Sequence, residues 1–231
     1  VPALVVLLAG LGLSLAQSQW QWGAFLGITM ALWIAVTAGI AVYERFHNRS
    51  LLSALRSTPG GFYGMLLGHL GIAVFIIGVT LTSLYTVEKD LRMAPGDTYT
   101  VSGYEFTFHG VRDFNVANYV ATRGGFSVRS LDGDYQADMF PEKRVYRVQN
   151  NPMTEAAIDA GLTRDLFIAL GEPLDNQGAW AVRIYYKPFI RWIWLGAIIM
   201  SIGGLFAASD RRYRRLARSR SVSGDAADLA S

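Results

Sequence analysis

Four stretches of the chain contain no Asp, Glu, Lys or Arg, and they dominate its pattern of hydrophobic and polar positions. They are Val1–Ala16, Gly23–Tyr43, Tyr63–Leu84 and Trp192–Ala208. Because a helix that crosses a membrane needs about 20 mostly apolar residues, the longer stretches predict transmembrane helices. The first stretch is shorter, and we interpret it as a span whose beginning is truncated. The pattern therefore predicts an integral membrane α-helical protein with four transmembrane helices.

A polar stretch of 104 residues, 85–188, separates the third and fourth spans, and its hydrophobic residues alternate as they do in β-strands. Tyr104–Val111 places three aromatic residues on one face, and residues 143–149 and 180–186 alternate again. A segment of this length is large enough to have a core of its own. We expect one mainly-β extracytoplasmic domain here, a small barrel or sandwich.

Turn signals divide this polar stretch further. Asn118–Ser130 is a hairpin candidate broken at Gly124 and Gly125, and Asp132-Gly133 is a typical turn dipeptide. Residues 154–160 suit a short helix and a strand about equally, so both remain open. Gly124 and Gly125 do not precede a helical pattern, which excludes a phosphate-binding loop at this point.

Arginine gathers in two segments beside the spans. Residues 44–62 hold three arginines against one glutamate, and residues 209–231 hold six arginines against three aspartates. The positive-inside rule places both segments in the cytoplasm and the polar stretch on the outer face. We expect two transmembrane helices in 1–43, a cytoplasmic basic loop in 44–62, a transmembrane helix in 63–84, a periplasmic domain in 85–188, a transmembrane helix in 189–208 and a cytoplasmic Arg-rich tail in 209–231.

Composition excludes several classes of protein. The chain is 52% hydrophobic and only 17% charged, whereas soluble domains carry about 25% charged residues, so a soluble enzyme and a disordered protein are excluded. The long polar stretch argues against a purely helical transporter. With no cysteine, disulfides, zinc–thiolate sites and cysteine nucleophiles are excluded.

The net charge of +3 is unevenly distributed: residues 85–188 carry −3 and the rest of the chain carries +6. The surplus arginines lie beside membrane spans, where they set topology and contact anionic membrane lipid. No nucleic-acid-binding motif accompanies them. We therefore expect membrane lipid as a partner and no nucleic acid.

His69 is the only ionisable residue within the four spans. Such residues are costly in lipid and usually mark a site in the interior of the helix bundle. At about 1.5 Å per residue, it lies roughly 9 Å below the cytoplasmic end of its span. Gly64, Gly68, Gly71 and Gly78 form a stripe beside it, and small residues at such spacing let a backbone or a flat ligand approach closely.

Three interpretations of His69 are open from the residues alone. It can support helix packing, bonded to a neighbouring serine or carbonyl group; it can ligate haem iron through a neutral imidazole nitrogen; or it can take part in a proton relay. No other span contains a histidine, so a second histidine ligand would come from outside this chain. No enzyme motif occurs in residues 85–188, and we expect His109 and His47 to be ordinary surface histidines.

Four short motifs follow one another along the chain. They are FYGMLLGHLG at 62–71, RMAPGD at 92–97, PEKRVY at 141–146 and MTEAAI at 153–158. Together with the segment from Trp180 into the last span, they resemble the C-terminal portion of the CcmF (CcmF/NrfE) family, the membrane haem lyase subunits of bacterial cytochrome c maturation. The resemblance covers nearly the whole chain.

The resemblance implies a role for the membrane histidine. In the family, a b haem lies in the membrane between two histidines, and His69 matches the second of them. The b haem is proposed to pass electrons to an incoming haem, with quinol as a suggested donor. His69 is thereby implied as an axial ligand of the haem b iron, with Gly64, Gly68 and Gly71 as the face of closest approach.

The resemblance also implies a reaction and partners. The family is thought to attach haem, received from the chaperone CcmE, to the Cys-x-x-Cys-His motif of apocytochrome c at the bacterial inner membrane. CcmH-type and CcmI-type subunits are the usual partners. The family's tryptophan-rich segment and periplasmic histidines belong to the N-terminal part of the lyase, which is therefore a further partner, and we expect no complete activity from this chain alone.

A docking surface on the outer domain is expected at the PEKRVY motif, through Pro141, Glu142, Lys143, Arg144 and Tyr146. The alternative function belongs to another class: a membrane-anchored interaction module of the cytochrome c assembly complex, with no haem ligation of its own.

Overall fold

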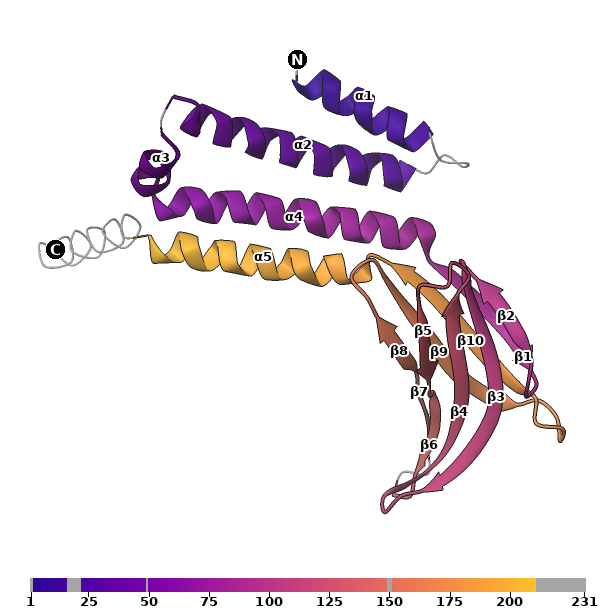
Figure 1. The fold of residues 1–231 in the computed structure, drawn as a ribbon. Helices are drawn as coiled ribbons and strands as arrows, with labels where there is room; N and C mark the ends of the chain where they lie inside the picture. Colours follow the sequence, from indigo (N-terminus) through magenta and orange to yellow (C-terminus); the bar gives the residue numbers. More distant parts are fainter. Residues whose placement is uncertain (1, 16–21, 49, 149–150, 211–231) are drawn as a thin grey trace, which may run out of the picture. The chain divides into compact units, whose positions relative to one another are not determined.

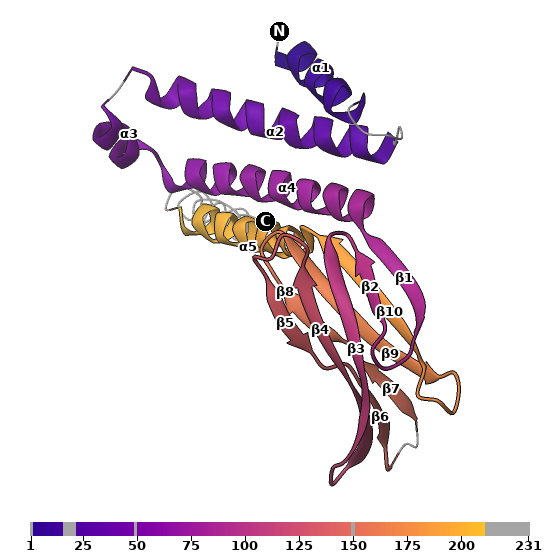
Figure 2. The same ribbon diagram turned by 45° about the vertical axis from the view of Figure 1, so that its right-hand side comes forward.

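The computed structural model describes residues 2–15, 22–48, 50–148 and 151–210, which form two compact units (Figures 1 and 2). The helical unit comprises residues 1–80 and 192–231, and the β unit comprises residues 81–191. Arg49 and the arginines of the expected basic tail, from residue 211 onward, lie outside the described residues.

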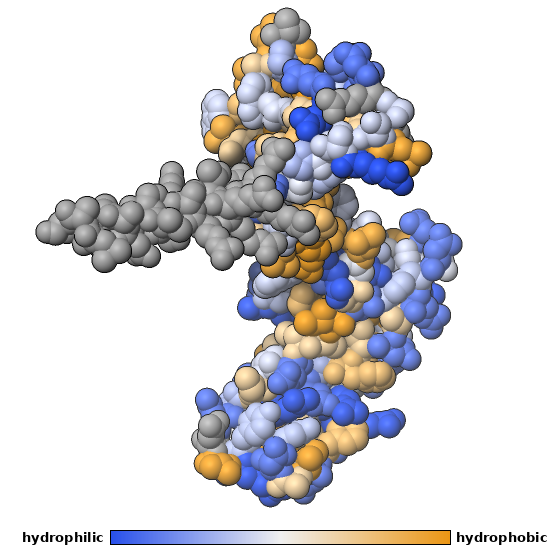
Figure 3. Space-filling view, turned by 90° about the vertical axis from the view of Figure 1, so that its left-hand side faces the viewer, coloured by the Kyte–Doolittle hydropathy of each residue, from blue (hydrophilic) through white to orange (hydrophobic). Residues whose placement is uncertain are grey.

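Five helices are found along the described chain, and three of them are long and apolar enough to cross a membrane. The helices are α1 (Pro2–Leu15), α2 (Trp22–Phe46), α3 (Leu51–Ser57), α4 (Gly60–Tyr85) and α5 (Ile190–Ser209). The three long ones are α2, α4 and α5, while α1 is apolar but shorter. Large hydrophobic residues of these helices are exposed, and hydrophobic residues lie open on the space-filling surface (Figure 3). This is the composition of helices whose solvent is lipid, and it confirms the predicted class of membrane protein.

Helix α3 was not predicted, and it lies within the expected basic loop. Its sequence, LLSALRS, contains no glycine or proline, so nothing in it opposes a short helix. The Thr58 hydroxyl donates a hydrogen bond to the Ala54 carbonyl oxygen at 2.7 Å, and Pro59 follows directly. The start of α4 is stabilised differently, since the Gly61 N–H donates to the carboxylate of Asp210 at 2.7 Å.

The β unit consists of two antiparallel sheets (Figure 2). One has the order β1-β10-β9-β8, and the other has the order β2-β3-β4-β6-β7 with β5 also paired to β4. The strands are β1 (Val87–Met93), β2 (Thr98–Val101), β3 (Tyr104–Asn115), β4 (Tyr119–Ser130), β5 (Gln136–Met139), β6 (Glu142–Tyr146), β7 (Pro152–Glu155), β8 (Ala157–Ala160), β9 (Arg164–Pro173) and β10 (Trp180–Pro188).

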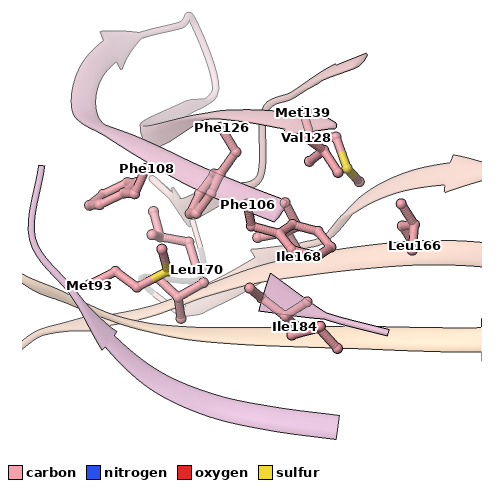
Figure 4. Close-up of a cluster of buried hydrophobic side chains, with 12 residues drawn as sticks. Met93, Phe106, Phe108, Phe126, Val128, Met139, Leu166, Ile168, Leu170 and Ile184 are labelled. Carbon is pink, nitrogen blue, oxygen red and sulfur yellow. The ribbon is translucent and has the colours of Figure 1, made fainter. Parts of the chain in front are cut away.

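A hydrophobic core lies between the inner faces of the two sheets (Figure 4). Phe106 and Phe108 of β3 are completely buried and point into it, as the alternation of this segment predicts. Ile168 and Leu170 of β9 and Ile184 of β10 meet them from the other sheet. The predicted mainly-β domain is therefore confirmed, and its architecture is a sandwich.

Three local predictions are decided by the structure. The hairpin expected within Asn118–Ser130 is wrong, because β4 runs unbroken through Gly124 and Gly125 and the hairpin is formed by β3 and β4. Residues 154–160 are strand rather than helix, as parts of β7 and β8. The Asp132-Gly133 turn is confirmed, with Gly133 at a φ of 81° between β4 and β5.

Candidate functional site

His69 lies on an exposed, apolar side of α4. Its Nδ1 atom is 2.8 Å from the Met65 carbonyl oxygen. Because a carbonyl oxygen can only accept, Nδ1 carries the proton and donates it, and the neutral ring then keeps its lone pair on Nε2. Nε2 has no hydrogen-bond partner among the described residues. A backbone carbonyl that fixes the tautomer and orientation of a histidine is typical of metal-ligating imidazoles.

The glycine stripe of α4 faces α5 rather than a ligand. A Cβ atom placed on Gly64 would lie 2.6 Å from the Ala207 backbone nitrogen, and one on Gly71 would lie 2.7 Å from the Met200 backbone nitrogen. Gly196 of α5 makes the reciprocal approach, with a Cβ position only 2.6 Å from the Gly71 carbonyl oxygen. The close approach expected at this stripe is thus between two helix backbones.

The contact between Gly64 and Gly71 of α4 and the backbone of α5 is hereafter the seam. The position of His69 relative to the seam corrects the expectation that it lies beside the glycines. At about 100° per residue, His69 is roughly 140° around the helix from Gly64. It therefore points away from α5, and Gly64 and Gly71 do not form a face shared with it. At Gly68, a Cβ atom would meet nothing within 4 Å, so this position alone is not filled by α5.

Helix α2 lies against the His69 side of α4, but closer to the other end of the helix. Gly27 packs against the Thr80 side chain, and Thr80 is about 20° from His69 around α4, three turns further along. Thr80 is buried by this contact. His69 and its neighbours Met65 and Ile72 remain exposed. This open side of α4, defined by His69, Met65 and Ile72, is hereafter the histidine face.

The PEKRVY motif is held mainly by contacts within the β unit. The Glu142 side chain is only 8% exposed and accepts hydrogen bonds from Arg123 at 2.6 Å and from Arg144 at 2.7 Å. Lys143 pairs with Glu172 on the other sheet. Pro141 is completely buried. The prediction that Pro141 and Glu142 contact a partner directly is therefore corrected, because both are covered by their own domain.

Lys143, Arg144 and Tyr146 are half-buried, and a docking role for them stays a prediction. His109 is exposed on β3, on the face opposite Phe106 and Phe108, and its Nε2 lies 2.8 Å from the Ser127 hydroxyl. Sequence reasoning missed Arg123 as a partner of Glu142. The two residues are nineteen positions apart, and only the register of β4 against β6 brings them opposite each other.

The Glu142 cluster predicts how stability depends on pH. Burial alone would raise the pKa of Glu142, but the hydrogen bonds from Arg144 and Arg123 outweigh it and lower this pKa below its ordinary value of 4.5. The stabilisation is therefore complete above the ordinary value, and it is lost as the pH falls below that value and through the lowered pKa of the folded state. We expect the unfolding midpoint of the full-length protein in detergent to drop between about pH 5 and pH 3. The drop should be smaller in Glu142→Gln, and an equal drop in both proteins would contradict the assignment.

Comparison of the sequence with known proteins identifies the family of the chain. The sequence model described as "CcmF C-terminal beta-sandwich" matches residues 84–188. The chain is 45% identical over 201 residues to the cytochrome c-type biogenesis protein CcmF of Pseudomonas aeruginosa, covering 87% of the chain and 30% of that protein. It is also 45% identical over 192 residues to CcmF of Escherichia coli K12, covering 82% of the chain and 28% of that protein. The chain belongs to the CcmF family.

A solved structure supports the same fold. The chain superposes on a structure of "Cytochrome c Heme Lyase CcmF" with a TM-score of 0.70 and 17% sequence identity, covering 89% of the chain and 33% of that structure. Within the CcmF family, the chain corresponds to a C-terminal portion and spans about a third of the length of the relatives it matches. CcmF membership and the helices together make it part of a multi-pass membrane protein.

Proposed function

We propose that this chain is the C-terminal part of a membrane haem lyase subunit for c-type cytochrome maturation, in which His69 is one axial ligand of a b haem. The observation that carries the proposal is the hydrogen bond from His69 Nδ1 to the Met65 carbonyl oxygen, which leaves Nε2 available on an exposed side of α4. Relatives named for cytochrome c-type biogenesis provide the context.

The residues of the histidine face fit a haem. Neutral imidazole is a common axial donor to haem iron, and Met65 and Ile72, about one turn before and after the histidine along α4, offer exposed apolar side chains beside it. Bound haem would supply an iron that changes oxidation state by one electron. The protein's part is to fix the imidazole orientation through Met65 and to exclude water with apolar side chains.

The second axial ligand is proposed to come from outside this chain. Among the described residues, no group of three His, Asp or Glu side chains is placed to hold a metal ion, and His69 is the only histidine of the membrane helices. The N-terminal part of the same lyase is the proposed source. Gly64 and Gly71 are left out of the haem site, because α5 occupies their side of the helix.

The proposal includes a location and partners. Arg45 and Arg56 lie at the ends of α2 and α3, which supports a cytoplasmic position for this side and a periplasmic β unit at the bacterial inner membrane. Apocytochrome c, the haem chaperone CcmE, and CcmH-type and CcmI-type subunits are the proposed partners, with quinol as the electron donor.

Replacing His69 with alanine in the full-length protein should abolish the absorption bands of the b haem, because the axial nitrogen is lost. His69→Gly should recover a low-spin spectrum when imidazole is added, since free imidazole can fill the vacated position. The measurement is the reduced-minus-oxidised absorption spectrum of the purified protein, normalised to protein concentration.

Leu70→Ala and His109→Ala are the matched controls, since Leu70 is the exposed neighbour on the next position of α4 and His109 is an exposed histidine of the β unit. Both should retain the spectrum. An unchanged spectrum in His69→Ala would rule out ligation and favour the interaction module without haem of its own.

A further inference from the structure

Arginine and aromatic side chains share the outer face of the sheet formed by β3, β4, β6 and β7. The register places Arg112 opposite Arg123, and Tyr119 opposite Tyr146. Residues at alternate positions of a strand lie on one face, so these side chains are joined there by Phe114 of β3, Arg144 of β6 and Met153 of β7. We call this the arginine–aromatic face: Arg112, Phe114, Tyr119, Arg123, Arg144, Tyr146 and Met153. Its strands β3 and β4 form the long curved ribbon of the β unit in Figure 1.

Most of the cations on this face are already engaged. The Arg123 guanidinium lies 4.3 Å from the centre of the Phe114 ring, and that of Arg144 lies 5.0 Å from the centre of the Tyr119 ring. Both arginines also donate to the buried carboxylate of Glu142. These contacts order the guanidinium groups and hold them close to aromatic surface.

Arg112 is the exception. It lies directly opposite Arg123 across the strand pair, and like charges in this position are destabilising. Among the described residues, Arg112 makes no ion pair or hydrogen bond through its side chain, and it is exposed. The face therefore has an unpaired cation that an anion from outside would stabilise.

A cavity of about 450 Å³ adjoins Arg112. It forms where β3 carries a bulge opposite Gly125; Gly110 adopts a φ of 97° in this bulge, and Gly125 has no side chain to fill the space. Arg112, Arg123 and the rings of Phe114 and Phe140 line the cavity, with Asp138 as its only carboxylate. Phe140 is 56% exposed. The volume suits one large side chain or a small ligand.

We propose that the arginine–aromatic face binds an acidic segment of a partner protein. The segment would place a carboxylate on Arg112 and an apolar side chain between Phe114 and Phe140. A protein segment is favoured over a small anion because the face continues past the cavity across four strands. Arginine and aromatic residues are also enriched where proteins meet.

Charge complementarity supports an acidic partner. The β unit is acidic, since residues 85–188 carry a net charge of −3. On the arginine–aromatic face, Glu142 and Glu155 offset Arg123 and Arg144, so Arg112 is the cation that is left for a partner. An acidic segment would be attracted to Arg112 and repelled by the acidic remainder of the β unit. The proposal does not depend on haem ligation by His69, and the two can fail separately.

The test uses the full-length protein in detergent and a fluorescently labelled probe peptide with three acidic residues flanking one phenylalanine. Fluorescence anisotropy measures its dissociation constant. We expect Arg112→Gln to weaken binding by about fivefold and Phe140→Ala by about tenfold. Arg92→Gln is the matched control, because Arg92 is an exposed arginine on β1 of the other sheet, paired with Asp175. It should bind the probe as the unchanged protein does.

A second probe, with Asp and Glu replaced by Asn and Gln, separates charge from apolar contact and should bind at least about tenfold more weakly. Equal binding of both probes, or equal affinities in Arg112→Gln, Phe140→Ala and Arg92→Gln, would overturn the proposal. Displacement of the acidic probe by millimolar citrate as effectively as by unlabelled peptide would indicate a small-anion site and would also overturn it. An unchanged thermal unfolding midpoint in Arg112→Gln and Phe140→Ala should show that the β unit is folded.

Discussion

Replacing Gly71 with leucine is expected to force α4 and α5 apart and to lower the free energy of unfolding by about 3 kcal/mol. A Cβ atom at Gly71 would lie 2.7 Å from the Met200 backbone nitrogen and 2.8 Å from the Gly196 carbonyl oxygen. These are backbone atoms of a helix, so they cannot move aside as the end of a flexible side chain would. The strain is therefore relieved only by separating the helices.

Gly68→Leu provides the control for this prediction. Gly68 is on the same helix, three residues earlier, but a Cβ atom there meets nothing within 4 Å. Unfolding by SDS, followed in the detergent-solubilised full-length protein, should show a large loss for Gly71→Leu and a loss below about 1 kcal/mol for Gly68→Leu. Equal losses would mean that the seam does not hold α4 to α5. Because His69 points away from the seam, the absorption bands of the haem that we propose at His69 should keep their positions in the Gly71→Leu molecules that remain folded.

The sequence pattern predicts the class of fold correctly, because positions that face lipid or the core are occupied by apolar residues. Charge-free stretches of about 20 residues predict spans, and they correspond to α2, α4 and α5. Alternation in β3 correctly places Phe106 and Phe108 in the core. In both cases, the type of residue reports whether its side chain meets lipid, core or water. The identity of the helix or strand that packs against it is not needed.

Predictions about partners are harder, because the same residues suit several neighbours. The stripe of Gly64 and Gly71 permits a close approach without identifying what approaches, and the structure places α5 there. His69 was expected beside the stripe, but counting around the helix already separates them by roughly 140°. A helical projection would have revealed this difference, whereas the identity of the neighbouring helix requires the fold.

The cavity beside Arg112 on the arginine–aromatic face depends even more on how the strands are paired. Gly124 and Gly125 look like a turn in the sequence, yet they lie within β4 where its pairing changes from β6 to β5. The missing side chain at Gly125 helps to form the cavity beside Arg112. A glycine pair in a strand pattern can mark a bulge as well as a turn, and only the pairing of β3 with β4 distinguishes the two.

Truncating Glu142 to alanine is the second large effect that we expect, with a loss of about 2 kcal/mol in the stability of the β unit. Its carboxylate is only 8% exposed and joins Arg123 and Arg144. Removing it leaves two guanidinium groups beside each other without their shared counter-charge. A third guanidinium, that of Arg112 on β3, lies opposite Arg123. The sheet then loses an ion-pair network and gains repulsion at the same place.

Glu155→Ala separates this effect from the general loss of an acidic residue. Glu155 lies opposite Glu142 on β7 and also contacts Arg144, at 3.4 Å, but its side chain is 42% exposed. Water screens this pair, so its removal should cost less than about 1 kcal/mol. Thermal unfolding of the full-length protein in detergent would compare the two variants. If both lost the same stability, Glu142 would be an ordinary surface carboxylate; if only Glu142→Ala were strongly destabilised, the motif's main task would be to hold the arginines of the outer face in place.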